Sequence, residues 1–189
     1  MHKIKYILQF IGIIFLLLLY KILGLRLSSN LSGYIFLFLG PAFRSSNIAQ
    51  NNLKKAFPNS NFNERKKILK KMWFNYGRIF SEYMFIKNFR NSFNFSNKIT
   101  IENQEILEKI KSDKEPVIFI SGHFNNFELM AMEIEKAGIE LAAIYRPLNN
   151  IFLNKTMEKI RKENICKNQI KKGRAGSREV IKNLIEGKS

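Results

Sequence analysis

Residues that bind metals or form disulfides are scarce in this sequence. Its 189 residues include one cysteine, Cys166, and two histidines, His2 and His123. A single cysteine excludes an internal disulfide, which suits a reducing compartment. Cys166 lies in a stretch without a nearby histidine, so we assign it no catalytic role. Because His2 lies at the far terminus, we expect no multi-histidine metal site and no cofactor.

Acidic residues are scarce too. The chain has 15 acids against 32 lysines and arginines, a formal net charge of +17, and residues 1–43 contain no acid. This charge suits an anionic membrane surface, an acidic carrier protein or a phosphorylated substrate. Nucleic acid would suit it equally, and an AT-rich genome that favours lysine explains part of the excess as well. The apolar content of 46% argues against disorder.

The segment Ile4–Leu25 is almost wholly apolar and predicts a membrane-spanning helix. At ~1.5 Å per residue it roughly matches a hydrocarbon core of ~30 Å. A cleaved signal peptide is the alternative, but no small-x-small cleavage site follows Tyr20, which favours a retained anchor. A second apolar run, residues 34–43, is too short to span and is expected in the interface or against the body. Lysine and arginine flank both ends of the anchor, so charge leaves its topology open. The larger basic excess after the anchor favours a body in the cytoplasm.

The remaining sequence alternates between amphipathic helices and short apolar strands. We therefore predict an α/β fold, in which an N-terminal transmembrane helix and a helical segment precede a mainly parallel sheet with flanking helices. The predicted domains are a membrane anchor (1–28), a helical membrane-proximal region (29–100) and an α/β core (101–189). Helices are predicted over residues 44–57, 63–86, 103–111, 126–137, 151–163 and 176–186, strands over 116–121 and 140–145, and a connection into a short strand over 88–100.

Pro116–Ser121 is the strongest strand candidate, because it is short, branched, apolar and bounded by turn residues. With the helix over residues 126–137 and the strand over 140–145 it would form a βαβ unit, which implies a parallel sheet. In such sheets ligands bind beyond the carboxyl ends of the strands. The residues that follow Ser121 are therefore the first place to look for a site.

His123 and Glu128 lie at this place, between the predicted strand and the first turn of the next helix. A histidine with a pKa near ~6.5 can act as a base near neutral pH. A carboxylate bonded to one ring nitrogen would fix its tautomer and stabilise the imidazolium. Two simpler interpretations stay open: Asn125 with Glu128 resembles a capping box, and His123 could be an ordinary, partly buried histidine.

Beyond this pair, several elements in order resemble the bacterial lipid A biosynthesis acyltransferases, the late lauroyl/myristoyl transferases. They cover roughly residues 4–187 and are more specific than His-x4-Glu alone. The elements are the N-terminal anchor, Arg44…Ile48-Ala49…Asn52-Leu53…Ala56-Phe57-Pro58, Gly122-His123…Glu128, Tyr145-Arg146-Pro147, Arg161, and Gly173-Arg174…Arg178…Ile181…Leu184…Gly187.

The resemblance implies an enzyme that moves a fatty acyl group from acyl carrier protein to a hydroxyl of a lipid A precursor. His123 would be the general base, Glu128 would orient it, and Arg146 and Arg161 would bind substrate phosphate or an oxyanion. The implied partners are the carrier protein, a phosphorylated glycolipid and the cytoplasmic face of the inner membrane, and no nucleic acid is expected.

Length separates this chain from the family it resembles. Chains of that family run well beyond this length, so we expect the α/β core to be incomplete and apparently truncated at its C-terminal side. The alternative is a catalytically inactive, membrane-anchored basic module that binds anionic lipid or nucleic acid. The two hypotheses differ in whether acyl transfer occurs at His123.

Overall fold

A computed structural model describes residues 2–43 and 45–189. They form two compact units, one of residues up to Ile14 with Ile86–Ser189, and one of Phe15–Phe85. Arg44, which opens one predicted helix and one element of the resemblance, lies outside the described residues. The predicted division at residues 28 and 100 stays a prediction.

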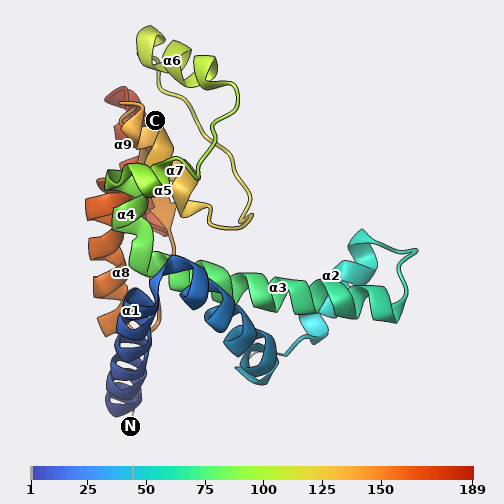
Figure 1. Ribbon diagram of the computed structural model, residues 1–189. Helices are drawn as coiled ribbons and strands as arrows, with labels where there is room; N and C mark the ends of the chain where they lie inside the picture. Colours follow the sequence, from blue (N-terminus) through green and yellow to red (C-terminus); the bar gives the residue numbers. More distant parts are fainter. Residues whose placement is uncertain (1, 44) are drawn as a thin grey trace. The chain divides into compact units, whose positions relative to one another are not determined.

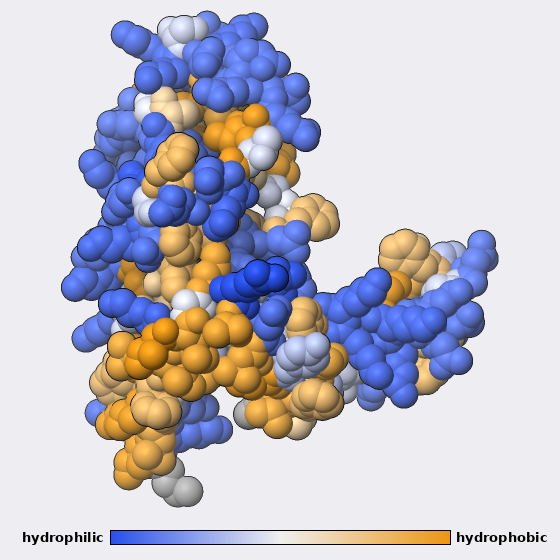
Figure 2. Space-filling model, in the orientation of Figure 1, coloured by the Kyte–Doolittle hydropathy of each residue, from blue (hydrophilic) through white to orange (hydrophobic). Residues whose placement is uncertain are grey.

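The N-terminal helix α1 runs from His2 to Phe43 and is interrupted at Gly24, where φ is 75° and ψ is 167°. Glycine adopts a positive φ without the clash of a Cβ, so the break falls at the residue best able to make it. Lys3–Ala42 is long and apolar enough to cross a membrane, judged by length and composition. Figure 2 shows apolar side chains gathered over α1, as expected for a membrane anchor.

In the unit of Phe15–Phe85, the later part of α1 packs with α2 (Asn47–Ala56) and α3 (Phe62–Glu82). A capping box begins α3, where the Asn61 side chain and the Glu64 carboxylate each accept a backbone N–H bond. A Cβ at Gly77 would lie 2.2 Å from the carbonyl oxygen of Ser32, so glycine permits this close approach of α3 to α1. After Glu82, the predicted helix tightens into a 3-10 turn, η1 (Tyr83–Phe85).

The other unit is mostly helical (Figure 1). Its early part, α4 and α5, replaces the connection and strand predicted over residues 88–100. The phenylalanines there pack on each other rather than pairing in a sheet, with the Phe89 and Phe95 rings 5.3 Å apart. Arg90 also binds Glu135 at 2.9 Å. The helices are α4 (Ile86–Asn91), α5 (Phe93–Ser96), α6 (Gln104–Asp113), α7 (Glu128–Lys136), α8 (Ile151–Asn164) and α9 (Arg174–Ile185).

The sheet of the described residues has two parallel strands, β1 (Ala142–Tyr145) and β2 (Asn168–Lys171). Their register runs from Ala142 opposite Asn168 to Tyr145 opposite Lys171. The α/β prediction is therefore correct in part: the parallel βαβ unit exists, but it is β1–α8–β2. The predicted strand Pro116–Ser121 is extended and does not join this sheet, and the backbone of Ser189 bonds to Glu140 and Ala142 at the start of β1.

The sequence did not predict β2, because its stretch is rich in lysine and asparagine and holds one apolar residue, Ile170, which is 1% exposed. Cys166, just before β2, is fully buried, and its thiol donates to the carbonyl of Leu141 at 2.7 Å. Burial raises the pKa of this thiol to about 11. The role of Cys166 in the structure is therefore to fill the core beside the sheet.

The first turns of α1 belong to the same unit as α8. Asn150 caps α8 by accepting the backbone N–H groups of Phe152 and Leu153. Its amide also donates to the carbonyl of Tyr6 at 2.9 Å. One asparagine therefore begins α8 and ties it to the N-terminal helix.

Candidate active site

The imidazole of His123 lies in the connection between the extended segment and α7. The side chain is exposed, and its ring packs on Phe127 with the ring centroids 4.4 Å apart. Asn125, two residues later, has φ 47°, a left-handed conformation that asparagine tolerates better than most residues. The turn at Asn125 brings the chain from the extended segment into α7.

Glu128 is the first residue of α7 and is buried, with 6% of its surface exposed. Both Nε and Nη2 of Arg161 donate to its Oε1 atom, at 2.8 Å and 2.5 Å. Because Phe127 occupies the cap position, Glu128 is not the N3 partner of an Asn125 cap. The capping-box interpretation is therefore wrong, and the buried carboxylate is balanced instead by a guanidinium from α8.

Arg161 is itself held over an aromatic ring. Its guanidinium carbon lies 5.6 Å from the centroid of Tyr145, a cation–π contact. The Tyr145 hydroxyl donates to the Glu158 carboxylate, which also accepts from Asn154 at 2.8 Å and lies 3.2 Å from the Lys171 ammonium. This set links the last residue of β1 to α8 and β2.

The Tyr145–Glu158 bond favours one protonation state of each partner. Burial and this hydrogen bond raise the pKa of Tyr145 above its ordinary value. The same bond is the main cause that lowers the pKa of Glu158. Near neutral pH the phenol therefore stays protonated and the carboxylate ionised, so the bond persists.

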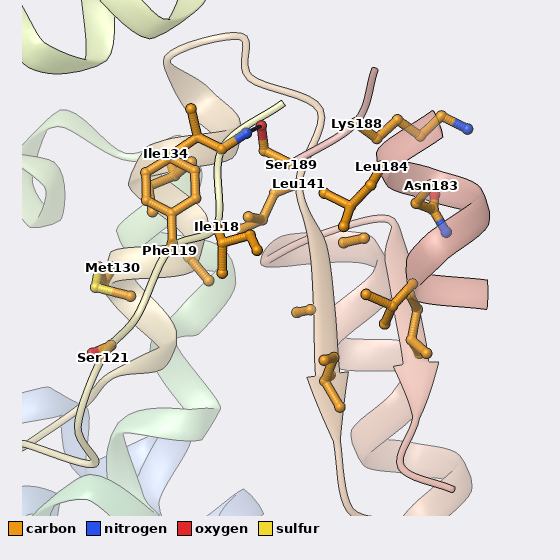
Figure 3. Close-up of a pocket in the computed structure, with 17 residues that line it drawn as sticks. Ile118, Phe119, Ser121, Met130, Ile134, Leu141, Asn183, Leu184, Lys188 and Ser189 are labelled. Atoms are coloured by element: carbon orange, nitrogen blue, oxygen red, sulfur yellow. Dashed lines mark hydrogen bonds between the residues drawn. The ribbon is translucent and has the colours of Figure 1, made fainter. Parts of the chain in front are cut away.

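His123, Glu128 and Arg161 line one small cavity of about 180 Å³ at the end of β1. This is below the ~300–1,000 Å³ of ordinary ligand pockets. It adjoins an apolar groove of about 320 Å³ (Figure 3), with which it shares five lining residues: Ser121, Met130, Ala131, Ala143 and Ile144. The other residues that line the cavity are Gly122, Phe127, Tyr145 and Gln169.

The structure brings together three of the four residues predicted for the site. Arg146 is exposed and does not belong to the described lining of the cavity. No motif in the sequence points to Phe127, Gln169 or Glu158. Glu158 lies 13 residues after Tyr145 across a strand–helix connection, a separation that carries no sequence signal.

This arrangement can support proton transfer. An exposed imidazole shares a cavity with a buried carboxylate whose charge a guanidinium balances, so a hydroxyl that enters the cavity could pass its proton to a ring nitrogen. Within residues 2–43 and 45–189, no three His, Cys, Asp or Glu side chains gather in a way that could hold a metal ion. The roles of His123, Glu128, Arg146 and Arg161 stay predictions.

Comparison with known proteins gives one match. The family model described as "Bacterial lipid A biosynthesis acyltransferase" matches residues 1–189. No curated protein and no solved structure matches the chain. The match spans every element described above and confirms the resemblance seen in the sequence. The chain therefore belongs to the bacterial lipid A biosynthesis acyltransferase family.

Proposed function

We propose that this chain catalyses transfer of a fatty acyl group from the thioester of acyl carrier protein to a hydroxyl of a lipid A precursor. Membership of the family supports acyl transfer. The observation that carries the mechanism is the cavity that His123, Glu128 and Arg161 share at the end of β1. The proposed place of action is the cytoplasmic face of the bacterial inner membrane, with α1 as the anchor.

In the proposed step, a nitrogen of the His123 imidazole takes the proton of the acceptor hydroxyl. The hydroxyl oxygen then attacks the thioester carbonyl carbon, and the carbon–sulfur bond breaks. The imidazolium returns the proton to the departing thiolate, so the carrier leaves as a thiol and an ester is formed. Glu128, when bonded to the other ring nitrogen, would orient the imidazole and stabilise its charged form.

The arginines have different places in this proposal. Arg161 binds Glu128 and lies over Tyr145, which supports a role in holding the carboxylate. The family resemblance also assigns Arg161 to substrate phosphate or an oxyanion. Arg146 is exposed and follows β1 directly, so it is available to a phosphate of the acceptor or to an acidic side chain of the carrier.

The proposal is tested with His123→Ala in membranes that contain the chain, supplied with radiolabelled acyl-acyl carrier protein and a lipid A precursor. Loss of general-base catalysis typically lowers the rate by ~10²–10⁴-fold. The matched control is Phe124→Ala, which changes an exposed neighbour outside the cavity lining and is expected to keep the wild-type rate.

Two outcomes would contradict the proposal. One is full acyl transfer by His123→Ala at equal expression. The other is a wild-type chain that shows no turnover but binds anionic vesicles or nucleic acid in a salt-sensitive manner. The second result would favour the alternative, an inactive basic module.

A further inference from the structure

A groove with both apolar and basic lining lies between α1 and α3, within the unit of Phe15–Phe85. Its volume is about 680 Å³. From α1 it is lined by Tyr34 and Leu37, and from α3 by Ile68, Lys70, Lys71, Met72, Phe74, Asn75 and Arg78. The groove therefore combines aromatic and aliphatic side chains with three cations.

Close contacts between the two helices build this groove. A Cβ at Gly33 would lie 2.7 Å from Cε2 of Phe74, so glycine lets this ring reach the backbone of α1. The rings of Tyr34 and Phe74 meet edge to face with their centroids 5.2 Å apart. The Nε of Arg78 donates to the hydroxyl of Ser29 at 3.0 Å. Packing and one polar bond therefore hold the apolar and the basic residues of the groove beside each other.

The positive charge on α3 is not offset by acids of the same unit. Residues 15–85 contain eleven lysines and arginines but two acids. On α3, the pairs Lys66–Lys70 and Lys67–Lys71 place like charges four residues apart, where they repel each other. Neither Lys70 nor Lys71 forms an ion pair with any residue in 2–43 or 45–189. An anion from outside the chain would therefore relieve this repulsion.

The apolar part of the lining indicates what kind of anion fits. Tyr34 and Leu37 belong to Lys3–Ala42, the stretch that is long and apolar enough to cross a membrane. A ligand that contacts this stretch in a bilayer is a lipid. An acidic protein or a nucleic acid would match the cations but not the apolar side chains beside them. Lysines and arginines next to a membrane helix are typical of sites for anionic headgroups.

We propose that this groove binds one anionic phospholipid. Its phosphate lies at Lys70, Lys71 and Arg78, and one acyl chain lies along Tyr34 and Leu37. Because Arg78 uses Nε for Ser29, its two terminal nitrogens can donate to the phosphate oxygens. This lipid is neither the donor nor the acceptor of the proposed reaction, and its binding fixes α3 at the membrane surface.

The test measures lipid binding by native mass spectrometry of the full chain in a nonionic detergent. Phosphatidylglycerol and phosphatidylcholine with the same acyl chains are added in equal amounts. One variant carries Lys70→Gln with Lys71→Gln. The matched control carries Lys54→Gln with Lys55→Gln, an adjacent pair on α2 outside the lining of the groove. Glutamine has nearly the helix propensity of lysine, so both variants should keep the wild-type circular dichroism.

A lysine near an anionic headgroup raises binding roughly five-fold. The wild type should therefore prefer phosphatidylglycerol by at least about ten-fold, and the groove variant should prefer it by less than about two-fold. The control should keep the wild-type preference. Inorganic phosphate and glycerophosphoglycerol, which lack acyl chains, should not displace the bound lipid.

Four results would overturn the proposal. They are no preference in the wild type, an equal loss in both double variants, displacement by the headgroup compounds, and displacement by acyl carrier protein or an oligonucleotide. Equal loss would indicate a diffuse attraction to the basic surface, and the last result would identify a different partner. Acyl transfer is not measured, so failure here is independent of the proposed function.

Discussion

The carboxylates of Glu128 and Glu158 and the imidazole of His123 are held in contrasting ways. Glu128 and Glu158 lie in a packed region, where α7, α8, β1 and β2 each contribute a bonded partner or a wall. His123 lies at the end of an extended segment that is bound at Val117 by the Ser189 hydroxyl. The carboxylate of the candidate pair is therefore placed by tertiary structure, and the imidazole by its short connection to α7.

This contrast teaches what the sheet contributes to the site. Residues 117–121 are apolar and branched, but they pair with no described strand and stay largely exposed. The polar segment β2 forms a strand because it pairs with β1. Pairing and burial, more than composition, decide which of the two segments forms a strand. Substitutions matched across the two regions should therefore have unequal effects.

The largest effect is expected from Arg161→Ala. This change leaves the buried Glu128 carboxylate without its guanidinium, and breaking a buried ion pair typically costs about 3–5 kcal/mol. Urea denaturation followed by circular dichroism in detergent measures the loss. The double variant Arg161→Met with Glu128→Leu should recover much of it, and a loss below about 1 kcal/mol in the single variant would show that the pair is not buried in solution.

Ile170→Ala is expected to cost about 3 kcal/mol, because it opens a cavity in the core of β2. Its counterpart in the extended segment, Ile120→Ala, should cost less than about 0.5 kcal/mol, as surface changes do. The same denaturation curves give both values. Similar losses at the two positions would mean that residues 117–121 are packed as firmly as β2.

Gly176→Ala should cost about 1–3 kcal/mol, the range for overpacking. The added Cβ would lie 2.0 Å from the backbone oxygen of Lys171, which cannot move aside alone. The control is Gly122→Ala, whose Cβ would meet the exposed ring of Phe124, a side chain that can turn away. Thermal melting should separate the two variants, and equal midpoints would refute the distinction.

The smallest effect is expected from Glu158→Gln. The pKa of Glu158 is lower in the folded protein than its ordinary value of 4.5, so its stabilisation is present above that value and is lost as pH falls through the folded pKa. The wild type should therefore lose stability on acidification, and the variant should lose less. Melting between pH 7 and pH values below about 4 measures the difference, which should stay below about 1 kcal/mol. Parallel pH curves would show that Glu158 does not titrate in that range.

The sequence predicted the elements whose signals are local. Helices with a clear apolar stripe and a cap, such as α3 and α8, lie within a few residues of their predicted positions. An apolar N-terminal helix and the strand before Arg146 were also predicted. In the structure α1 is longer than the predicted Ile4–Leu25 and includes the second apolar run, residues 34–43. These features depend on periodicity, caps and short apolar runs, which neighbouring residues determine.

What the sequence could not predict depends on distant partners. Residues 116–121 have every property of a buried strand, but the structure pairs β1 with β2 instead. Arg161 reaches Glu128 across 33 positions of the chain, and no spacing rule connects them. The predicted order of strand, turn and helix indicated that His123 and Glu128 lie at one place. That the Arg161 guanidinium balances Glu128 could be seen only in the folded structure.

Cys166 gives the molecule a reporter of its own. It is the sole thiol in the chain, fully buried, with a pKa raised to about 11, so little thiolate forms while the core around Ile170 stays closed. Alkylation needs the thiolate and access to it. The rate at which a maleimide labels the native protein therefore reports on opening of the core around Cys166, without any engineered probe.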